Sequence, residues 1–407
     1  MAYRIESESA ASSRPRTTAL PPVSRLPSPV LFWVGVLGVV TFELLAVWLI
    51  MPLPGSQRMR SIDLAYEVYQ WRWPIRALFG VLILVGALPA WRAPGWRRWL
   101  APAGLVAVAA VAYVTNFIMA ADQMFKQPGV VTMLPAATNA VKLDRLVVGI
   151  EVGGEARAYP LMFIGYHHQV RDTVAGRDVL VSYCTVCRTG RVFSPMVDGK
   201  AERFRLVGMD HWNAMFEDET TKSWWRQANG EAVTGARKGT TLEEFPSQQL
   251  TLAQWLALHP ASLVMQGDPA FAEEYAKDYA FENGTSRKSL TGTDTTSWGE
   301  KSWVVGIVAD GQAVAFDWKR LRKERVINAT VGTTPIVLAL ARDNASFFAF
   351  ARPDTSTRFA MRNDSLVAGA AAFALSGRGT AGALRAIPAS QEFWHSWRTF
   401  RPGTGRY

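Results

Sequence analysis

The chain has 407 residues, a hydrophobic content of 49% and a formal net charge of +10, and this length allows two or three domains. Residues 1–121 carry 11 arginines, no lysine and five acidic residues, a net charge of +6. The rest carries 33 basic and 29 acidic residues, a net charge of +4. Because the large C-terminal region is nearly balanced in charge, the composition gives no case for nucleic-acid binding.

The N-terminal third has the composition of a membrane anchor. Residues 1–28 are rich in Ser, Pro and Arg and are predicted to be a disordered cytoplasmic tail. Three apolar runs follow, and we predict transmembrane helices at about residues 30–51, 75–91 and 99–121, in a membrane region of residues 29–121. The first run is too long for an ordinary cleaved signal, and no small-residue cleavage site follows it. The lipid bilayer is therefore an expected partner.

Arginines indicate how these helices are oriented. They occur in the tail and between the second and third runs, at Arg4, Arg14, Arg16, Arg25, Arg92, Arg97 and Arg98. The positive-inside rule places both groups in the cytoplasm, although three arginines between the first two runs oppose this assignment. We expect a multi-pass protein of the bacterial inner (plasma) membrane, with everything after residue 121 outside the cytoplasm.

Two polar residues, Glu43 and Asn116, interrupt the apolar runs at similar expected depth. They could form a proton or ion relay or a hydrogen bond between helices. The sequence favours the hydrogen bond, which is the commoner role.

The C-terminal region contains an internal repeat. The segment Arg145–Met196 aligns without a gap on the residues 157 positions later, and matching Gly and apolar residues recur. Further along the offset falls to 142, where Trp255 matches Trp397, so the second copy is 15 residues shorter. This pattern predicts two copies of one mainly β unit, with a strand pair turning at Gly153-Gly154 and short helices around the two tryptophans.

The expected fold is therefore three transmembrane helices followed by a mainly β (β-rich α+β) extracytoplasmic domain built by internal duplication. Its predicted parts are a linker (residues 122–142), a first repeat (143–268), a connection (269–301) and a second, degenerate repeat (302–407).

The two cysteines of the chain, Cys184 and Cys187, lie in the first repeat in the run VLVSYCTVCRTGRVF. Alternation before the motif predicts a strand, and the residues after it argue against a helix, so we expect strand, tight loop and strand, with Gly190 allowing the turn. In the second repeat Ala341 and Asn344 occupy the cysteine positions. Since only the first repeat has kept the thiols, it is expected to be the working half.

Three hypotheses remain for this pair: a metal site, a redox-active dithiol in which both cysteines are catalytic, and a structural disulfide or buried thiols. A metal would need further ligands, with His167 as the first candidate and His168, His211 and Met209 as weaker ones. Two thiolates with His or Met favour copper over zinc. No His follows Cys187, which excludes covalent haem attachment, and no nucleotide-binding motif is present.

The run Phe216–Gln227 is dense in acids, hydroxyls and tryptophans, and it falls where the second copy is shortened. Its polar and aromatic residues could line a pocket beside the cysteines or form a capped helix start. The pocket candidates are Asp218, Thr221, Ser223, Trp225 and Gln227.

Several short runs together resemble a bacterial family labelled domain of unknown function 3179. They are H-x-x-V-x-D from His167, S-Y-C-x-x-C from Ser182, V-F-x-x-x-V-D-G from Val192, D-x-x-T-x-S-x-W-x-Q from Asp218 and G-E-A-V-x-G from Gly230. The resemblance covers most of residues 143–407 and implies a fold and a motif set but no reaction. The family motif places its histidine at His167. Its common form is C-P-x-C-G, where this chain has Thr185, Val186 and Arg188.

The sequence thus predicts a membrane-anchored protein whose cysteines and His167 form a copper or zinc centre, as a metal carrier or sensor. The alternatives are a periplasmic thiol–disulfide oxidoreductase and a non-catalytic binding or assembly module with a structural disulfide. Another extracytoplasmic or membrane protein is the candidate partner, and the sequence leaves open whether the protein is an enzyme.

Overall fold

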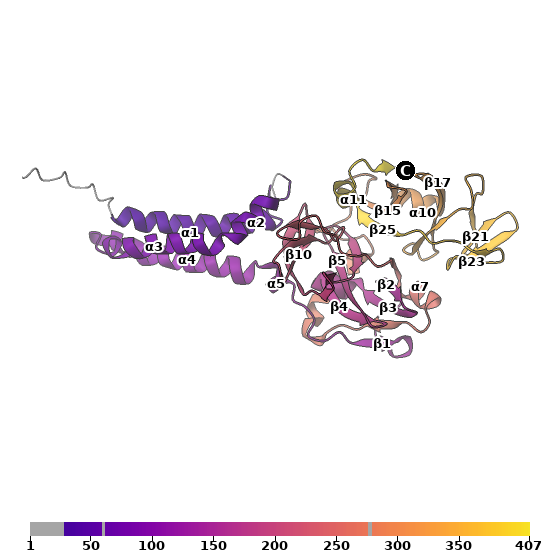
Figure 1. The fold of residues 1–407 in the computed structure, drawn as a ribbon, viewed down its shortest axis with the longest axis horizontal. Coiled ribbons are helices and arrows are strands. Elements are labelled where there is room, and N and C mark those ends of the chain that lie inside the picture. Colours follow the sequence, from indigo (N-terminus) through magenta and orange to yellow (C-terminus); the bar gives the residue numbers. More distant parts are fainter. Residues whose placement is uncertain (1–27, 59–61, 276–278) are drawn as a thin grey trace, which may run out of the picture. The chain divides into compact units, whose positions relative to one another are not determined.

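The computed structural model describes residues 28–58, 62–275 and 279–407 (Figure 1). The predicted disordered tail lies outside the described residues except for Ser28. The chain forms two compact units: the first ends at Val40 and resumes over Pro74–Val108, and the second holds Thr41–Trp73 and Ala109–Tyr407.

Among the described residues, three helical stretches are long and apolar enough to cross a membrane: Pro29–Ile50, Arg72–Trp91 and Gly95–Ile118, with mean hydropathies of 2.3, 1.7 and 1.7. The second begins slightly before the predicted run, and the third lies a few residues earlier than predicted. The N-terminal elements are α1 (Ser28–Ile50), α2 (Ile62–Gln70), α3 (Arg72–Trp91), η1 (Gly95–Trp99), α4 (Leu100–Tyr113), the π-helical turn η2 (Val114–Ile118) and α5 (Ala121–Met124).

Glycines bring α1 and α3 close together within the first unit. A Cβ at Gly86 would lie 2.2 Å from the backbone nitrogen of Phe32, and a Cβ at Gly38 would lie 2.3 Å from the ring of Phe79. Small residues at helix contacts permit this approach, which is how helices commonly associate in an apolar environment.

The second unit contains the predicted contact between the polar residues of the apolar runs. Asn116 donates to Glu43 Oε2 at 2.9 Å, and Thr115 Oγ1 donates to the same oxygen at 3.2 Å. Glu43 is 2% exposed. The hydrogen-bond hypothesis for Glu43 and Asn116 is therefore confirmed.

Most of the second unit is β structure, and its first part, residues 133–275, is called the first subdomain here. One sheet has the order β1-β14-β3-β2-β13, a second β4-β5-β6, a third β12-β11-β10-β9, and β7 pairs with β8. The elements are β1 (Met133–Pro135), η3 (Ala136–Thr138), β2 (Leu146–Val152), β3 (Glu155–Pro160), α6 (Leu161–His167), β4 (Gln169–Val174), β5 (Arg177–Cys184), β6 (Thr189–Phe193), β7 (Met196–Val197), β8 (Lys200–Ala201), β9 (Phe204–Asp210), β10 (Asn213–Asp218), β11 (Trp224–Arg226), β12 (Ala232–Thr234), β13 (Ser247–Thr251), α7 (Leu252–Leu258), β14 (Leu263–Met265), η4 (Pro269–Phe271) and α8 (Ala272–Tyr275).

The second subdomain, residues 303–407, follows the short helix α9 (Tyr279–Glu282). Its sheets have the orders β25-β15-β16-β26, β17-β18-β19 and β20-β21-β22-β23-β24. The elements are β15 (Trp303–Ala309), β16 (Gln312–Asp317), α10 (Trp318–Glu324), β17 (Val326–Val331), β18 (Thr334–Leu340), β19 (Phe347–Ala351), β20 (Ala360–Arg362), β21 (Ser365–Ala368), β22 (Ala371–Ala374), β23 (Arg378–Gly379), β24 (Gly382–Ala383), β25 (Ala389–Phe393), α11 (Trp394–Phe400) and β26 (Gly405–Arg406).

The two subdomains pair equivalent strands in the same register. Val148 of β2 faces Gln249 of β13, and the residues 157 and 142 positions later, Val305 and Gln391, face each other in β15 and β25. The parallel contact of β3 with β14 likewise recurs between β16 and β26.

The tryptophans of the repeat occupy the same place in both subdomains. Trp255 packs on Gly149, where a Cβ would lie 2.3 Å from the indole, and Trp397 packs on Gly306, where the distance would be 2.1 Å. Both indole nitrogens donate to a hydroxyl seven residues later, Ser262 or Thr404. The predicted short helices around these tryptophans are α7 and α11, so this prediction is confirmed.

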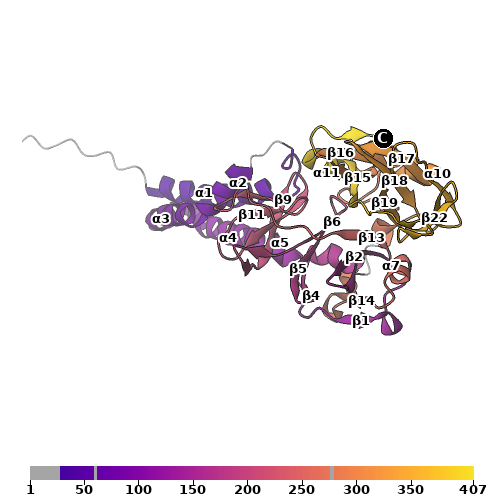
Figure 2. The same ribbon diagram turned by 45° about the vertical axis from the view of Figure 1, so that its right-hand side comes forward.

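The subdomains differ in what they add to this plan. Along the chain, the strands of the β9–β12 sheet lie between β6 and β13, where the second subdomain has β20–β24 between β19 and β25. The end of α1 and the helix α2 pack on this sheet through Leu49, Ala65 and Trp224. The subdomains contact each other through β6, β13 and β25 (Figures 1 and 2).

Replacing Gly306 by Ala should destabilise the protein by about 1–3 kcal/mol, because the new methyl group overlaps the Trp397 ring. Gly149→Ala should have a similar effect through Trp255. The measurement is denaturant unfolding of the full chain in detergent. Gly129→Ala is the matched control, since its Cβ would meet only an ordinary contact at 3.5 Å. Equal stability of Gly306→Ala and this control would contradict the packing described.

Candidate dithiol site

Cys184 and Cys187 lie in a tight turn between two strands. Cys184 ends β5 and pairs with Thr189, which begins β6. The strand–turn–strand prediction is therefore confirmed. The residue that allows the turn differs from the prediction, because Arg188 adopts the positive φ of 55° while Gly190 lies inside β6. A Cβ at Gly190 would lie 2.9 Å from Val148, so close packing explains this glycine.

Both cysteines are reduced and fully buried, with 0% exposure. Each thiol in its protonated form can donate to the carbonyl oxygen of Trp212, which lies 3.6 Å from Cys184 Sγ and 3.4 Å from Cys187 Sγ. The two side chains also hydrogen-bond each other. They belong to an apolar cluster that includes Met209 and, at its margin, Trp212.

The surroundings separate the two thiols chemically. Burial raises the pKa of Cys184. Hydrogen bonds from Cys187 and from backbone N–H groups, including that of Ala214, lower the pKa by more than burial raises it, so the pKa of Cys184 falls below its ordinary value. Burial and the neighbouring Cys184 sulfur hold the pKa of Cys187 well above its ordinary value. The pair therefore favours a thiolate at Cys184 and a proton on Cys187.

The second subdomain supplies part of the enclosure. Ser396 of α11 hydrogen-bonds Cys187, as does Asn213 of β10. The backbone N–H of Phe393 donates to the Cys187 carbonyl at 2.9 Å, and His395 Nε2 lies 3.0 Å from the Val186 carbonyl. The turn is thus held from both subdomains.

Two titratable groups beside the cysteines come from outside the first subdomain. Burial lowers the pKa of Lys301, against an opposing attraction from both sulfurs. Burial, followed by the charge of Lys301, lowers the pKa of His395 to about 4. His395 is therefore neutral at neutral pH, whereas the attraction of Lys301 for the sulfurs favours their thiolate form.

Among the predicted pocket residues, Gln227 lies closest to the cysteines in the hydrogen-bond network. It accepts from Asn213 Nδ2 at 3.0 Å, and its amide donates to Ser182 and to the Thr189 carbonyl at 3.1 and 3.0 Å. Gln227 thus fixes Asn213, which contacts Cys187, and the two strands that flank the turn.

The other pocket candidates form a closed network around Asp218. This carboxylate accepts from the Thr221 hydroxyl, the Ser223 backbone N–H and the Trp225 indole, the last at 2.8 Å. Asp218, Ser223 and Trp225 are at most 1% exposed. These contacts tie the turn between β10 and β11 to its own strands.

His167 has partners other than the cysteines. It is the last residue of helix α6. Its Nε2 lies 2.6 Å from the Tyr275 hydroxyl and its Nδ1 hydrogen-bonds the Lys126 carbonyl. Burial lowers the pKa of His167. Because both ring nitrogens are engaged, this geometry adds no support for a metal-ligand role, which stays a prediction.

The weaker ligand candidates have different surroundings. His168 follows α6 with φ of 61°, and its ring stacks on Phe125. His211 is in the β9–β10 turn beside Trp212, and its Nδ1 lies 2.6 Å from Asp210 Oδ1. Met209 is in the apolar cluster with the cysteines. Within residues 28–58, 62–275 and 279–407, no group of three or more His, Cys, Asp or Glu could hold a metal ion.

The sequence interpretation missed the contribution of the second subdomain. The sequence interpretation gives no functional role to His395, Lys301, Glu392 or Ser396. The repeat offered one usable signal, because it predicts that β25 and α11 take the same place beside β15 as β13 and α7 take beside β2. It does not predict that α11 touches the cysteine turn.

The family described as "Protein of unknown function (DUF3179)" matches residues 126–404, which is more than half of the chain. The chain therefore belongs to this family, as its motifs indicated. No curated protein and no solved structure matches the chain. Since the family description states no activity, the function must be argued from the site.

Arg188 connects the cysteine turn by hydrogen bonds to other parts of the protein. This fully buried guanidinium donates to Gln391 Oε1 at 2.9 Å and to the carbonyls of Phe281 and Glu282 at 2.9 and 3.0 Å. It also lies 3.5 Å from the ring centroid of Trp303. Burial lowers the pKa of Arg188 to about 10, so it remains charged at neutral pH.

Arg188→Met should cost about 3 kcal/mol or more of unfolding free energy, because it leaves buried acceptors without donors. Denaturant unfolding measures this loss. Arg320→Met, at a side chain that is 44% exposed, is the control and should cost less than about 0.5 kcal/mol. Losses of similar size in the two variants would show that Arg188 does not hold the turn.

Proposed function

We propose that the protein is a membrane-anchored thiol–disulfide oxidoreductase whose reactive pair is Cys184 and Cys187. The observation that carries the proposal is the pair of free, adjacent thiols whose sulfurs both lie against the Trp212 carbonyl oxygen, at 3.6 and 3.4 Å. The lowered pKa of Cys184 and the raised pKa of Cys187 agree with it. A nucleophilic thiolate next to a protonated resolving thiol is the arrangement that thiol–disulfide exchange uses.

In the proposed reaction the Cys184 thiolate attacks one sulfur of a partner disulfide. A mixed disulfide forms and one partner thiolate leaves. Cys187 then loses its proton and attacks Cys184 Sγ, which releases the second partner thiolate. The protein pair is oxidised by two electrons, the partner disulfide is reduced to a dithiol, and the reverse sequence reduces the protein pair.

The asymmetry between the subdomains supports this assignment. We propose that they arose by internal duplication, which is supported by the shared strand register and by the equivalent Trp–Gly contacts. The second subdomain has Ala341 and Asn344 in place of the cysteines. In this account it lost the thiols but kept a supporting role through Ser396 and His395.

We also propose that the β domain lies outside the cytoplasm, in the oxidising compartment where disulfides persist. The arginine distribution supports this orientation. Another extracytoplasmic or membrane protein with an exchangeable disulfide would then be the partner.

Copper or zinc binding is the second candidate function. It is favoured by the adjacency of two thiols beside the Trp212 carbonyl oxygen, since paired thiolates bind soft ions such as Cu(I). In that case Cys184 and Cys187 would be the principal ligands of a metal carrier or sensor.

Free-thiol titration of the full chain at set redox potentials tests the main proposal. The disulfide between Cys184 and Cys187 should form and break reversibly, with a midpoint reduction potential in the range of exchange-active dithiols, about −120 to −270 mV. A bond that resists reduction below about −300 mV would indicate a structural disulfide instead.

Elemental analysis of the same reduced sample tests the metal candidate, because bound metal that Cys184→Ser leaves unchanged cannot be held by this pair.

The orientation can be tested in intact cells with a membrane-impermeant amine reagent. Labelling should modify lysines of residues 122–407, such as the exposed Lys200, without lysis. Labelling of this region only after lysis would place it in the cytoplasm and contradict the proposed location.

A further inference from the structure

We propose that Ser396, Glu392 and Ser390 form a proton path from the Cys187 thiol to a cavity between the subdomains. The path deepens the proposed function, because the second step of the exchange requires Cys187 to lose a proton. The three residues are all in the second subdomain, on β25 and α11.

The inner end of the path starts at a group with no access to water. Cys187 is 0% exposed and hydrogen-bonds Ser396, which is also 0% exposed. Ser396 Oγ donates to Glu392 Oε2 at 3.0 Å, and Glu392 is 2% exposed. A buried carboxylate is therefore connected to the resolving thiol through a single hydroxyl group.

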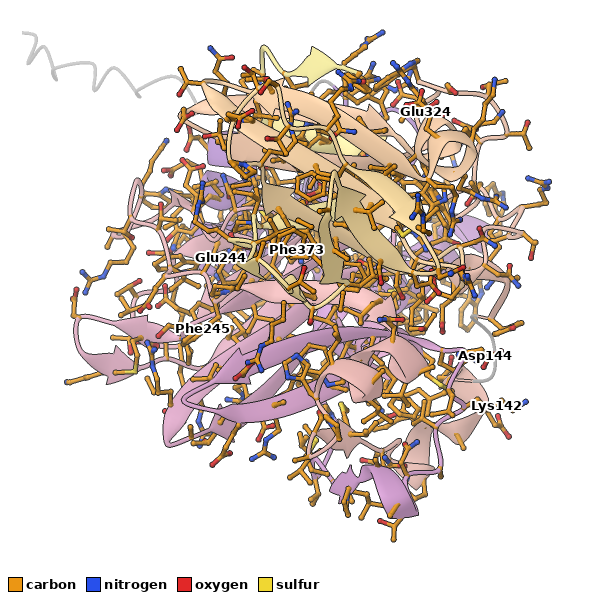
Figure 3. The ribbon with its side chains drawn as sticks, turned by 90° about the vertical axis from the view of Figure 1, so that its right-hand side faces the viewer. Lys142, Asp144, Glu244, Phe245, Glu324 and Phe373 are labelled. Carbon is orange, nitrogen blue, oxygen red and sulfur yellow. The ribbon has the colours of Figure 1, made fainter. Side chains whose placement is uncertain are left out.

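The outer end reaches the cavity. Glu392 Oε1 accepts from Ser390 Oγ at 3.1 Å and from Arg191 Nη2 at 2.6 Å. Ser390 and Arg191 both line a cavity of about 220 Å³, together with residues of both subdomains that include Glu244 and Phe245. Figure 3 labels these last two residues on the side of the first subdomain that meets the second.

The chemistry of the path follows from these contacts. When Cys187 attacks Cys184 Sγ, Ser396 Oγ takes the thiol proton and passes its own proton to Glu392 Oε2. The electron pair left on Cys187 forms the new S–S bond, and the partner thiolate leaves. Glu392 then returns its proton to the cavity through the Ser390 hydroxyl, which restores the carboxylate.

Comparison of the subdomains indicates that packing alone does not require these charges. At the repeat offsets, Glu392 corresponds to Leu250 and Arg191 corresponds to Phe348. Both counterparts are buried apolar residues. A buried ion pair carries a large desolvation cost. This pair joins the two subdomains next to the thiols and is replaced by apolar residues at the equivalent position, which is better explained by a chemical role.

The test follows the reaction of the reduced full chain, in detergent, with 2,2′-dithiodipyridine. The first equivalent of thiopyridone reports mixed-disulfide formation, and the second reports attack by Cys187. In Glu392→Gln and Ser396→Ala the second release should slow on the order of 100-fold at neutral pH, while the first stays unchanged. The difference in second-release rate between these variants and the unchanged protein should shrink as pH rises, because hydroxide can then remove the Cys187 proton.

Glu244→Gln is the matched control. Glu244 also contacts Arg191, at 3.4 Å, but has no contact with Ser396. The second thiopyridone release of Glu244→Gln should therefore keep a rate close to that of the unchanged protein. Ser396→Ala leaves the Arg191–Glu392 pair intact and decides the matter if Glu392→Gln fails to fold. A normal second release in Ser396→Ala would overturn the path alone. No second release in the unchanged protein would overturn the dithiol function as well.

Discussion

The hydrogen bond between Cys184 and Cys187, inside a site closed to water, is the interaction on which the account depends. Burial alone would raise the pKa of both thiols and leave them inert. Because one thiol can donate to the other, and backbone N–H groups converge on Cys184, a single negative charge is stabilised there while Cys187 keeps its proton. The turn between β5 and β6 provides this arrangement by holding the two sulfurs against one carbonyl oxygen, that of Trp212.

The enclosure needs both subdomains. The first contributes the cysteine turn and the β9–β10 hairpin that covers it, and the second contributes α11 and the end of β25. Arg188 joins the two through Gln391 and through the carbonyls of the last two residues of α9. The shared core includes apolar residues from both subdomains, such as Val148 and Phe350. A second subdomain without cysteines therefore has a physical role as one wall of the site.

Much of the fold could be predicted from the sequence. Uninterrupted apolar runs identified the three helices, alternation identified β5, and the spacing of Gly149, Trp255 and their counterparts identified equivalent strands. The surroundings of the cysteines could not be predicted, because Ser396 lies about 200 residues away in sequence and no local pattern reports such a contact. His167 shows the same limit: its family motif and its position before the cysteines suggested a ligand, but a helix ending at this residue directs its ring to Tyr275.

The most direct test of the central claim is site-resolved alkylation of the reduced protein as a function of pH, with the two cysteines distinguished by mass spectrometry. The account predicts that Cys184 reaches its full thiolate reactivity at a pH below that of an ordinary thiol, and that Cys187 reacts only far above it. Identical profiles for the two cysteines, at the pH of an ordinary thiol or higher, would contradict the account.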